Sequence, residues 1–210
     1  MRLLACLTAL LSSSSAWAVS SKSDEWTFRV MLDDKPIGLH RFSVVTNGEQ
    51  RLVTTEANFA VKFLGFAAYR YHHRAIEQWQ GDCLWHLDAT TNDDGTSSSV
   101  RSERNGGSLK VITERDTQVL SGCIMSFAYW NRALQSQSQL LNAQTGKVER
   151  VQIERIGTAK IDVHGQSKAT DQVRITGPAA PIDVWYSAEG DWVGLDSVVA
   201  GGHRLSYRLP

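Results

Sequence analysis

The sequence has no excess of charge of either sign, since Lys and Arg together number 22 and Asp and Glu also number 22. A protein that binds nucleic acid or an anionic membrane through its overall charge needs a basic excess. Several motifs are also absent: there is no glycine-rich phosphate loop, no G-x-S-x-G nucleophile elbow and no ligand-like spacing of Cys and His. We therefore expect no nucleic acid partner, no cofactor and no metal.

Long apolar runs are absent after the first residues of the chain. Met1 and Arg2 give a positive start, Leu3–Leu11 is an apolar stretch, and Ala16-Trp17-Ala18 is an A-x-A cleavage site. These are the three parts of a secretory signal peptide. No later segment approaches the roughly 18 consecutive apolar residues of a membrane-spanning helix. We predict that residues 1–18 are removed, that 19–210 form a single β-rich domain, and that it is periplasmic without a transmembrane anchor.

Cysteine is scarce, with three in the chain. Cys6 lies in the signal peptide, and reading it as a lipidation site leaves too few residues before it for an apolar region. The remaining two, Cys83 and Cys123, would lie in a compartment where disulfides form and persist. Neither is in a C-x-x-C motif or beside a histidine, which disfavours a metal or catalytic role. We predict that Cys83 and Cys123 pair, and two unpaired buried thiols are the alternative.

Apolar and polar residues alternate along most of the remaining chain, which is typical of β-strands. Asn47-Gly48 is a strong hairpin signal between strands expected at 37–46 and 51–59, so with 25–32 the domain opens as a three-stranded meander. Residues 60–67 are expected to be an apolar connector. Further strands are expected at 69–80, 83–91, 97–104, 109–114, 147–156, 159–163, 167–175, 182–187, 192–199 and 204–209.

Helical spacing of apolar residues is confined to 126–141, which carries Phe127, Trp130, Leu134 and Leu141. This segment is the best candidate for a short helix or an ordered loop. The fold class predicted is mainly β: a large curved antiparallel sheet or half-open β-barrel with one short helical segment, and a closed barrel is also compatible with the pattern. The concave face of such a sheet needs a cover, either segment 126–141 or a hydrophobic ligand.

Tryptophan is abundant, with seven in the chain. Large aromatic side chains usually pack in cores, but they also line ligand cavities. The densest aromatic patch, Phe127–Asn131, is the segment we would expect to gate or plug a cavity. The residues that we name as candidate lining of an apolar cavity are Trp26, Phe28, Phe66, Trp79 and Trp130.

Catalysis has one visible candidate, the group of His72, His73 and Glu77. On a strand His72 and His73 point to opposite faces, and Glu77 lies about 13 Å from His73 along the same face. This distance is too long for one shared metal. We interpret the group as a polar, partly exposed strand face. An envelope hydrolase using His73 and Glu77, or a distant Ser and His, is the alternative.

Several segments resemble a family of proteobacterial exported proteins known only as a domain of unknown function, over nearly the whole chain after the signal. These segments are Ala68–His73, Gly81–Leu84, Gly122–Asn131, Leu140–Gly146 and Ile182–Ser187. The resemblance supports the pairing of the two cysteines, because both lie in distinctive segments, and it supplies no catalytic residues.

A looser likeness, at the level of fold alone, is to the periplasmic lipoprotein carriers of the LolA and LolB type. It implies a hydrophobic cavity able to hold an acyl chain. We therefore expect non-enzymatic binding of an apolar ligand, a hydrophobic small molecule or lipid, or of an envelope protein. A structural accessory of the cell envelope is a further alternative.

Overall fold

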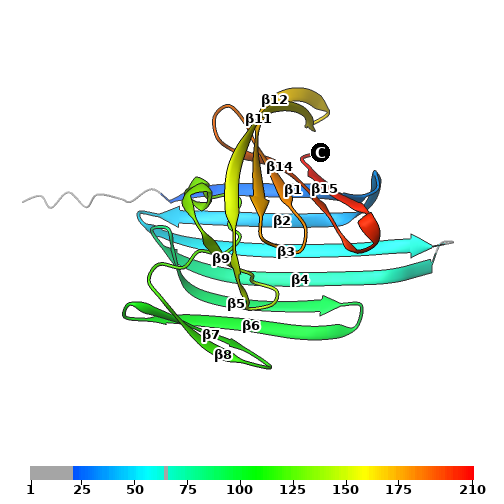
Figure 1. The fold of residues 1–210 in the computed structure, drawn as a ribbon. Coiled ribbons are helices and arrows are strands. Elements are labelled where there is room, and N and C mark those ends of the chain that lie inside the picture. The colour runs from blue at the N-terminus through cyan, green and yellow to red at the C-terminus, as the bar shows by residue number, and fades with distance from the viewer. Residues whose placement is uncertain (1–20, 64–65) are drawn as a thin grey trace, which may run out of the picture.

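The computed structural model describes residues 21–63 and 66–210, and they form one antiparallel sheet of 13 strands with a separate two-stranded ribbon. The chain first builds an up-and-down meander of eight strands (Figure 1). These are β1 (Lys22–Leu32), β2 (Lys35–Asn47), β3 (Gln50–Phe63), β4 (Phe66–Gln80), β5 (Cys83–Asp93), β6 (Thr96–Asn105), β7 (Ser108–Thr113) and β8 (Thr117–Ser121).

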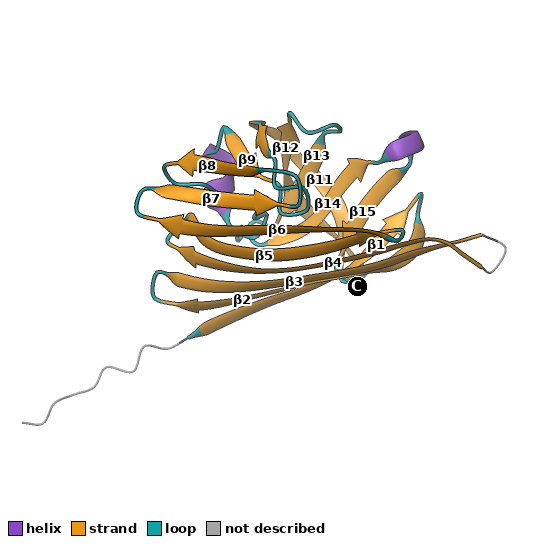
Figure 2. Ribbon diagram, turned by 90° about the horizontal axis from the view of Figure 1, so that it is seen from below, coloured by secondary structure: helices purple, strands orange, loops and turns teal. Residues whose placement is uncertain are grey.

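A second meander is added to the other side of β1, because the last strand of the chain pairs with β1. Its elements are β11 (Gln152–Val163), β12 (Gln166–Thr176), β13 (Ile182–Tyr186), β14 (Trp192–Val198), the 3₁₀ turn η2 (Ala200–Gly202) and β15 (Arg204–Arg208). The sheet curls so that β7 and β8 turn toward β11 and β12 without pairing with them (Figure 2). The predicted fold class is confirmed, in the form of a curved sheet that does not close.

The structure differs from the sequence prediction at three places, and a bulge accounts for the first of them. Gly157 lies in a bulge, so β11 runs through the position where we expected a break between two strands. The expected connector at 60–67 is also wrong, since β3 extends to Phe63 and β4 begins at Phe66. Thr117–Ser121, where no strand was predicted, forms the additional strand β8.

The concave face of the sheet carries the core. Facing residues of β2, β3 and β4 form transverse rows, such as Val44 beside Val53 and Val53 beside Glu77. Because side chains alternate between faces, residues two apart on each strand share this face. Phe28 and Val30 of β1 are fully buried in it.

The connection between the two meanders, residues 122–151, covers the concave face, and we call it the cover segment. It contains the 3₁₀ helix η1 (Arg132–Ser136) and the ribbon of β9 (Gln139–Leu141) and β10 (Val148–Arg150), with β9 passing over the inner side of the sheet (Figure 1). The short helix expected within 126–141 is therefore present, as a single turn. The buried apolar side chains of the cover segment are Ile124, Met125, Ala128, Leu134, Leu140, Leu141 and Val151. Except for the small Ala128, each contributes roughly 1.5–3 kcal/mol.

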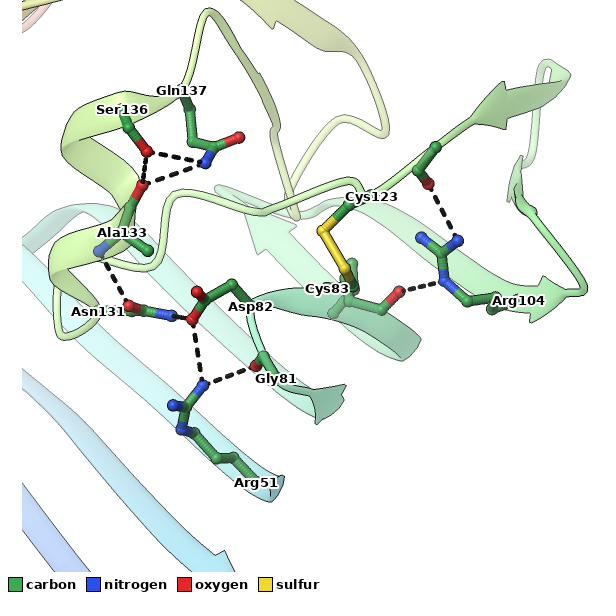
Figure 3. The surroundings of a disulfide bond; sticks show 12 residues. Arg51, Gly81, Asp82, Cys83, Arg104, Cys123, Asn131, Ala133, Ser136 and Gln137 are labelled. Carbon is green, nitrogen blue, oxygen red and sulfur yellow. Dashed lines mark hydrogen bonds and ion pairs between the residues drawn. A yellow bond between two sulfur atoms is a disulfide. The ribbon is translucent and has the colours of Figure 1, made fainter. Parts of the chain in front are cut away.

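A disulfide ties the start of the cover segment to the sheet (Figure 3). Cys83, at the first position of β5, is bonded to Cys123 with an S–S distance of 2.06 Å, as predicted. Arg104 of β6 stabilises the same junction, because its guanidinium donates to the carbonyl of Leu84 at 3.1 Å and to that of Gly122 at 3.0 Å. The disulfide bond and these hydrogen bonds together fix where the cover segment leaves the sheet.

Asn131 makes a second attachment, at the start of η1 (Figure 3). Its side-chain oxygen accepts from the backbone N–H of Ala133 at 3.0 Å, which caps the helical turn. Its amide nitrogen donates to the carboxylate of Asp82 at 2.9 Å. The guanidinium of Arg51 lies 3.5 Å from that carboxylate and 5.6 Å from the ring of Trp130. The aromatic part of the cover segment is thus held against the start of β3 and the β4–β5 turn.

Candidate functional site

A pocket of about 230 Å³, partly open to solvent, lies between the concave face of the sheet and the cover segment, and we call it the interior cavity. One wall comes from the inward faces of β2, β3 and β4. The opposite wall comes from the cover segment and from two residues of the second meander, Pro178 and Ile182. The remaining lining residues are His40, Phe42, Thr55, His73, Ala75, Glu77, Ser126, Phe127, Tyr129, Asn142, Ala143, Gln144 and Glu149.

Glu77 is the buried acid of this cavity, with an exposed fraction of 6%. Trp79, two residues further along the same face of β4, donates from Nε1 to Glu77 Oε2 at 2.9 Å. Burial raises the pKa of Glu77 from 4.5 to about 7, although hydrogen bonds from Trp79 and Ser126 act in the opposite direction. Near neutral pH the carboxyl group is therefore present in both its protonated and its ionised form.

Two histidines line the same cavity, His40 on β2 and His73 on β4, which lie on either side of β3. His73 is 4% exposed, and its Nδ1 lies 2.9 Å from the hydroxyl of Thr91. His40 Nδ1 lies 3.3 Å from the hydroxyl of Tyr207, whereas His40 Nε2 is buried with no hydrogen-bond partner in the described part of the chain. Burial lowers the pKa of His73 to about 4 and that of His40 to about 3. Both imidazoles are therefore neutral at pH 7.

Aromatic rings surround these polar groups. The ring of Phe42 lies 4.1 Å from that of His40, between ring centroids, and Phe127 and Tyr129 of the cover segment lie 6.2 Å apart. The only charged side chain of the lining besides Glu77, among the residues that the structure describes, is Glu149. Glu149 is half-buried and accepts a hydrogen bond from the amide of Asn142 at 2.8 Å. The cavity is thus aromatic and weakly acidic.

The interpretation of His73 and Glu77 as a partly exposed strand face is wrong, since both are buried. β4 lies in the middle of the first meander, and the cover segment packs over its inner face. Of His72, His73 and Glu77, therefore, only His72, which points outward, is exposed. His73 and Glu77 are held by different partners, Thr91 and Trp79. Within residues 21–63 and 66–210, no hydrogen bond joins the two.

The candidate cavity residues predicted from aromatic content form two separate groups. Trp26 and Phe28 of β1 lie beside Trp192, with centroid distances of 6.4 and 4.3 Å. Trp79 and Trp130 pack edge to face at 5.5 Å. These four line the core or the outer grooves and are not among the described lining of the interior cavity. The side chain of Phe66, at the start of β4, lies outside the described residues.

Sequence reasoning overlooked His40, which it left as an isolated histidine. The alternation of β2 places His40 on the same face as Phe42 and Val44, so its inward orientation was predictable from the pattern. Its partner Tyr207 lies at the other end of the chain, and no local pattern indicates that contact.

Neither a metal site nor a membrane-spanning helix appears in the part of the chain that the structure describes. No group of three or more His, Cys, Asp or Glu side chains there is placed to hold a metal ion. None of the helices there is long and apolar enough to cross a membrane.

Comparison with known proteins gives a family and a fold. A search of curated proteins found no match. A solved structure, described as a β-barrel-like protein of the domain of unknown function DUF1849 from Brucella abortus, is similar with a TM-score of 0.64. It shares 11% sequence identity, and the match covers 89% of this chain and 94% of that one, so the likeness shows the fold alone. The model of the domain of unknown function DUF6134 matches residues 28–210, and the chain therefore belongs to that family.

Proposed function

We propose that this protein is exported by a signal peptide at residues 1–18, acts in the periplasm as one β-rich domain, and binds a small, largely apolar ligand in the interior cavity without catalysing a reaction. The disulfide between Cys83 and Cys123 supports an oxidising compartment. The open, curled sheet supports a binding role, because such sheets enclose a space that side chains or a ligand must fill.

The observation that carries the proposal is the combination of aromatic walls with an unsatisfied polar atom inside the body of the protein. Ligand sites are usually apolar cavities with a few placed polar groups. His40 Nε2 is buried without a hydrogen-bond partner, and such atoms are rare because leaving them unsatisfied costs about 1–3 kcal/mol. A ligand would offset that cost once side chains of the lining move to expose this nitrogen.

The size of the cavity limits the ligand. Sites for drug-sized molecules measure roughly 300–1,000 Å³, and this cavity measures about 230 Å³. It therefore suits a small molecule, or the end of a longer apolar chain whose remainder stays outside the cavity. A whole lipid would not fit beneath the cover segment as it stands.

The hydrolase alternative has less support. An acid and a base that cooperate in catalysis must both reach the reacting group by hydrogen bonds. His73 and Glu77 are four residues apart on one strand, which corresponds to about 13 Å, and each is hydrogen-bonded to a different side chain. Both side chains are buried because they line the proposed binding cavity, and this requires no catalytic role.

Native mass spectrometry of the protein purified gently from a periplasm tests the proposal. We expect an extra mass that leaves on denaturation, and we expect Ala75→Leu to reduce it because Ala75 lines the cavity. Ala188→Leu is the matched control, since Ala188 is exposed and lines the outer groove beside Trp26. If the wild type carries no ligand, or if only the Ala188 variant loses it, the interior cavity is not the binding site. Co-purification of an envelope protein instead would favour the structural role.

A further inference from the structure

We propose that the ligand of the interior cavity carries a protonated amine beside its apolar part, and that Glu77 is the group that pairs with the amine. This inference rests on the proposed ligand-binding function and adds the charge of the ligand to it. It excludes free fatty acids and other carboxylates as the natural ligands of the cavity.

The charged groups that line the cavity favour a positively charged ligand. The lining residues that the structure describes include two acids, Glu77 and Glu149, and neither Lys nor Arg. His40 and His73 do not supply positive charge at neutral pH, because their burial favours the neutral imidazole. A carboxylate placed here would meet two acidic groups and no cation. An ammonium group would meet two acidic groups and no cation.

The surroundings of Glu77 also favour a positively charged ligand. An ionised carboxylate buried away from water is costly unless a positive charge and hydrogen bonds compensate it. Trp79 supplies one hydrogen bond, to Oε2, and the hydroxyl of Ser126 is the other neighbour on the protein side. Both are uncharged donors. A ligand ammonium, with its three N–H donors, would supply the missing positive charge.

The remaining walls fit the same ligand. Phe42, Phe127 and Tyr129 line the cavity, and the faces of aromatic rings attract cations. His40 also lines the cavity, and its neutral imidazole does not repel a cation. The apolar part of the ligand would lie against Ala75 and Ile182.

Calorimetric titration with three probes of equal carbon chain length tests the charge: n-hexylammonium, 1-hexanol and hexanoate, each at pH 7.5. We expect hexylammonium to bind about tenfold or more tightly than the other two, because a charge-assisted hydrogen bond adds to the same apolar contact. In Glu77→Gln, which keeps the shape and an acceptor oxygen, we expect that preference to fall to about twofold or less. Glu103→Gln, at an exposed position of β6, is the control and should keep it.

The outcomes separate the two proposals. If no probe binds and the purified protein carries no ligand, the proposed function itself fails. If hexanol or hexanoate binds as tightly as hexylammonium, the cavity binds ligands but the inferred charge is wrong. If the preference persists in a folded Glu77→Gln variant, Glu77 is not the pairing group. The wild-type comparison remains decisive if that variant does not fold.

Discussion

Replacement of Glu77 by glutamine should make the free protein more stable at neutral and alkaline pH. The pKa of Glu77 rises from 4.5 to about 7 on folding because the carboxyl group is buried. Since ionisation is easier in the unfolded chain, the folded state loses stability as the pH increases from about 4.5 to 7, and the loss remains above pH 7. At about 1.4 kcal/mol for each pKa unit, the full penalty is about 3 kcal/mol.

Glutamine cannot ionise, and its side-chain oxygen can still accept the hydrogen bond from Trp79 Nε1. The difference between variant and wild type should therefore grow in the variant's favour by up to about 3 kcal/mol between pH 4.5 and pH 8. Contributions of His40 and His73 cancel in this difference, because both proteins contain them. Urea unfolding at several pH values, with equal slopes for the two proteins, measures it.

Glu103→Gln provides the baseline for this experiment, because Glu103 is exposed. It should change the free energy of unfolding by less than about 0.5 kcal/mol at each pH. A difference between Glu77→Gln and wild type that is constant from pH 4.5 to pH 8 would refute the reasoning, since it would mean that Glu77 titrates alike in the folded and unfolded states.

Other parts of the structure give further predictions. Cys83→Ser should lower the free energy of unfolding by about 4 kcal/mol, because the disulfide closes a loop with a sequence separation of 40; non-reducing denaturant titration measures it, and an unchanged midpoint would contradict it. Gly177→Ala should destabilise the protein by more than about 2 kcal/mol, since its φ is +116° and a Cβ would lie 2.0 Å from the carbonyl oxygen of Arg150, whereas Gly107→Ala has open space and should cost far less by thermal unfolding. His40→Phe should reduce the loss of stability on acidification from pH 6.5 to 5 by about 2 kcal/mol, because burial lowers the pKa of His40 to about 3; equal pH profiles for variant and wild type would refute this.

Local patterns predicted much of the fold, because alternating apolar and polar residues and the residue types of turns both indicate antiparallel strands. Asn47-Gly48 predicted the hairpin between β2 and β3, and positive φ at Gly48 agrees with that turn. The pairing of Cys83 with Cys123 followed from their being the two cysteines beyond the predicted signal peptide. Alternation does not indicate which strands pair when they are far apart in the sequence. The pairing of β15 with β1, which joins the two meanders, was therefore not predictable.

The candidate site was predictable only in part. Alternation placed His73 and Glu77 on one face of their strand, but it does not say which face is buried, and the charge on both faces favoured exposure. The face is covered by residues 122–151, whose path depends on long-range contacts such as the hydrogen bond from Leu84 N–H to the carbonyl of Ile124. The burial of His73 and Glu77 could therefore be recognised only from the three-dimensional structure.

A crystal structure of the protein with bound n-hexylammonium would test the central claim most directly. We predict that the probe occupies the space between β2–β4 and the cover segment, with its nitrogen within hydrogen-bond distance of a Glu77 carboxylate oxygen and its chain beside Phe42. An empty interior, with the probe instead in the outer groove beside Trp26 and Trp192, would contradict the claim that this cavity is the ligand site.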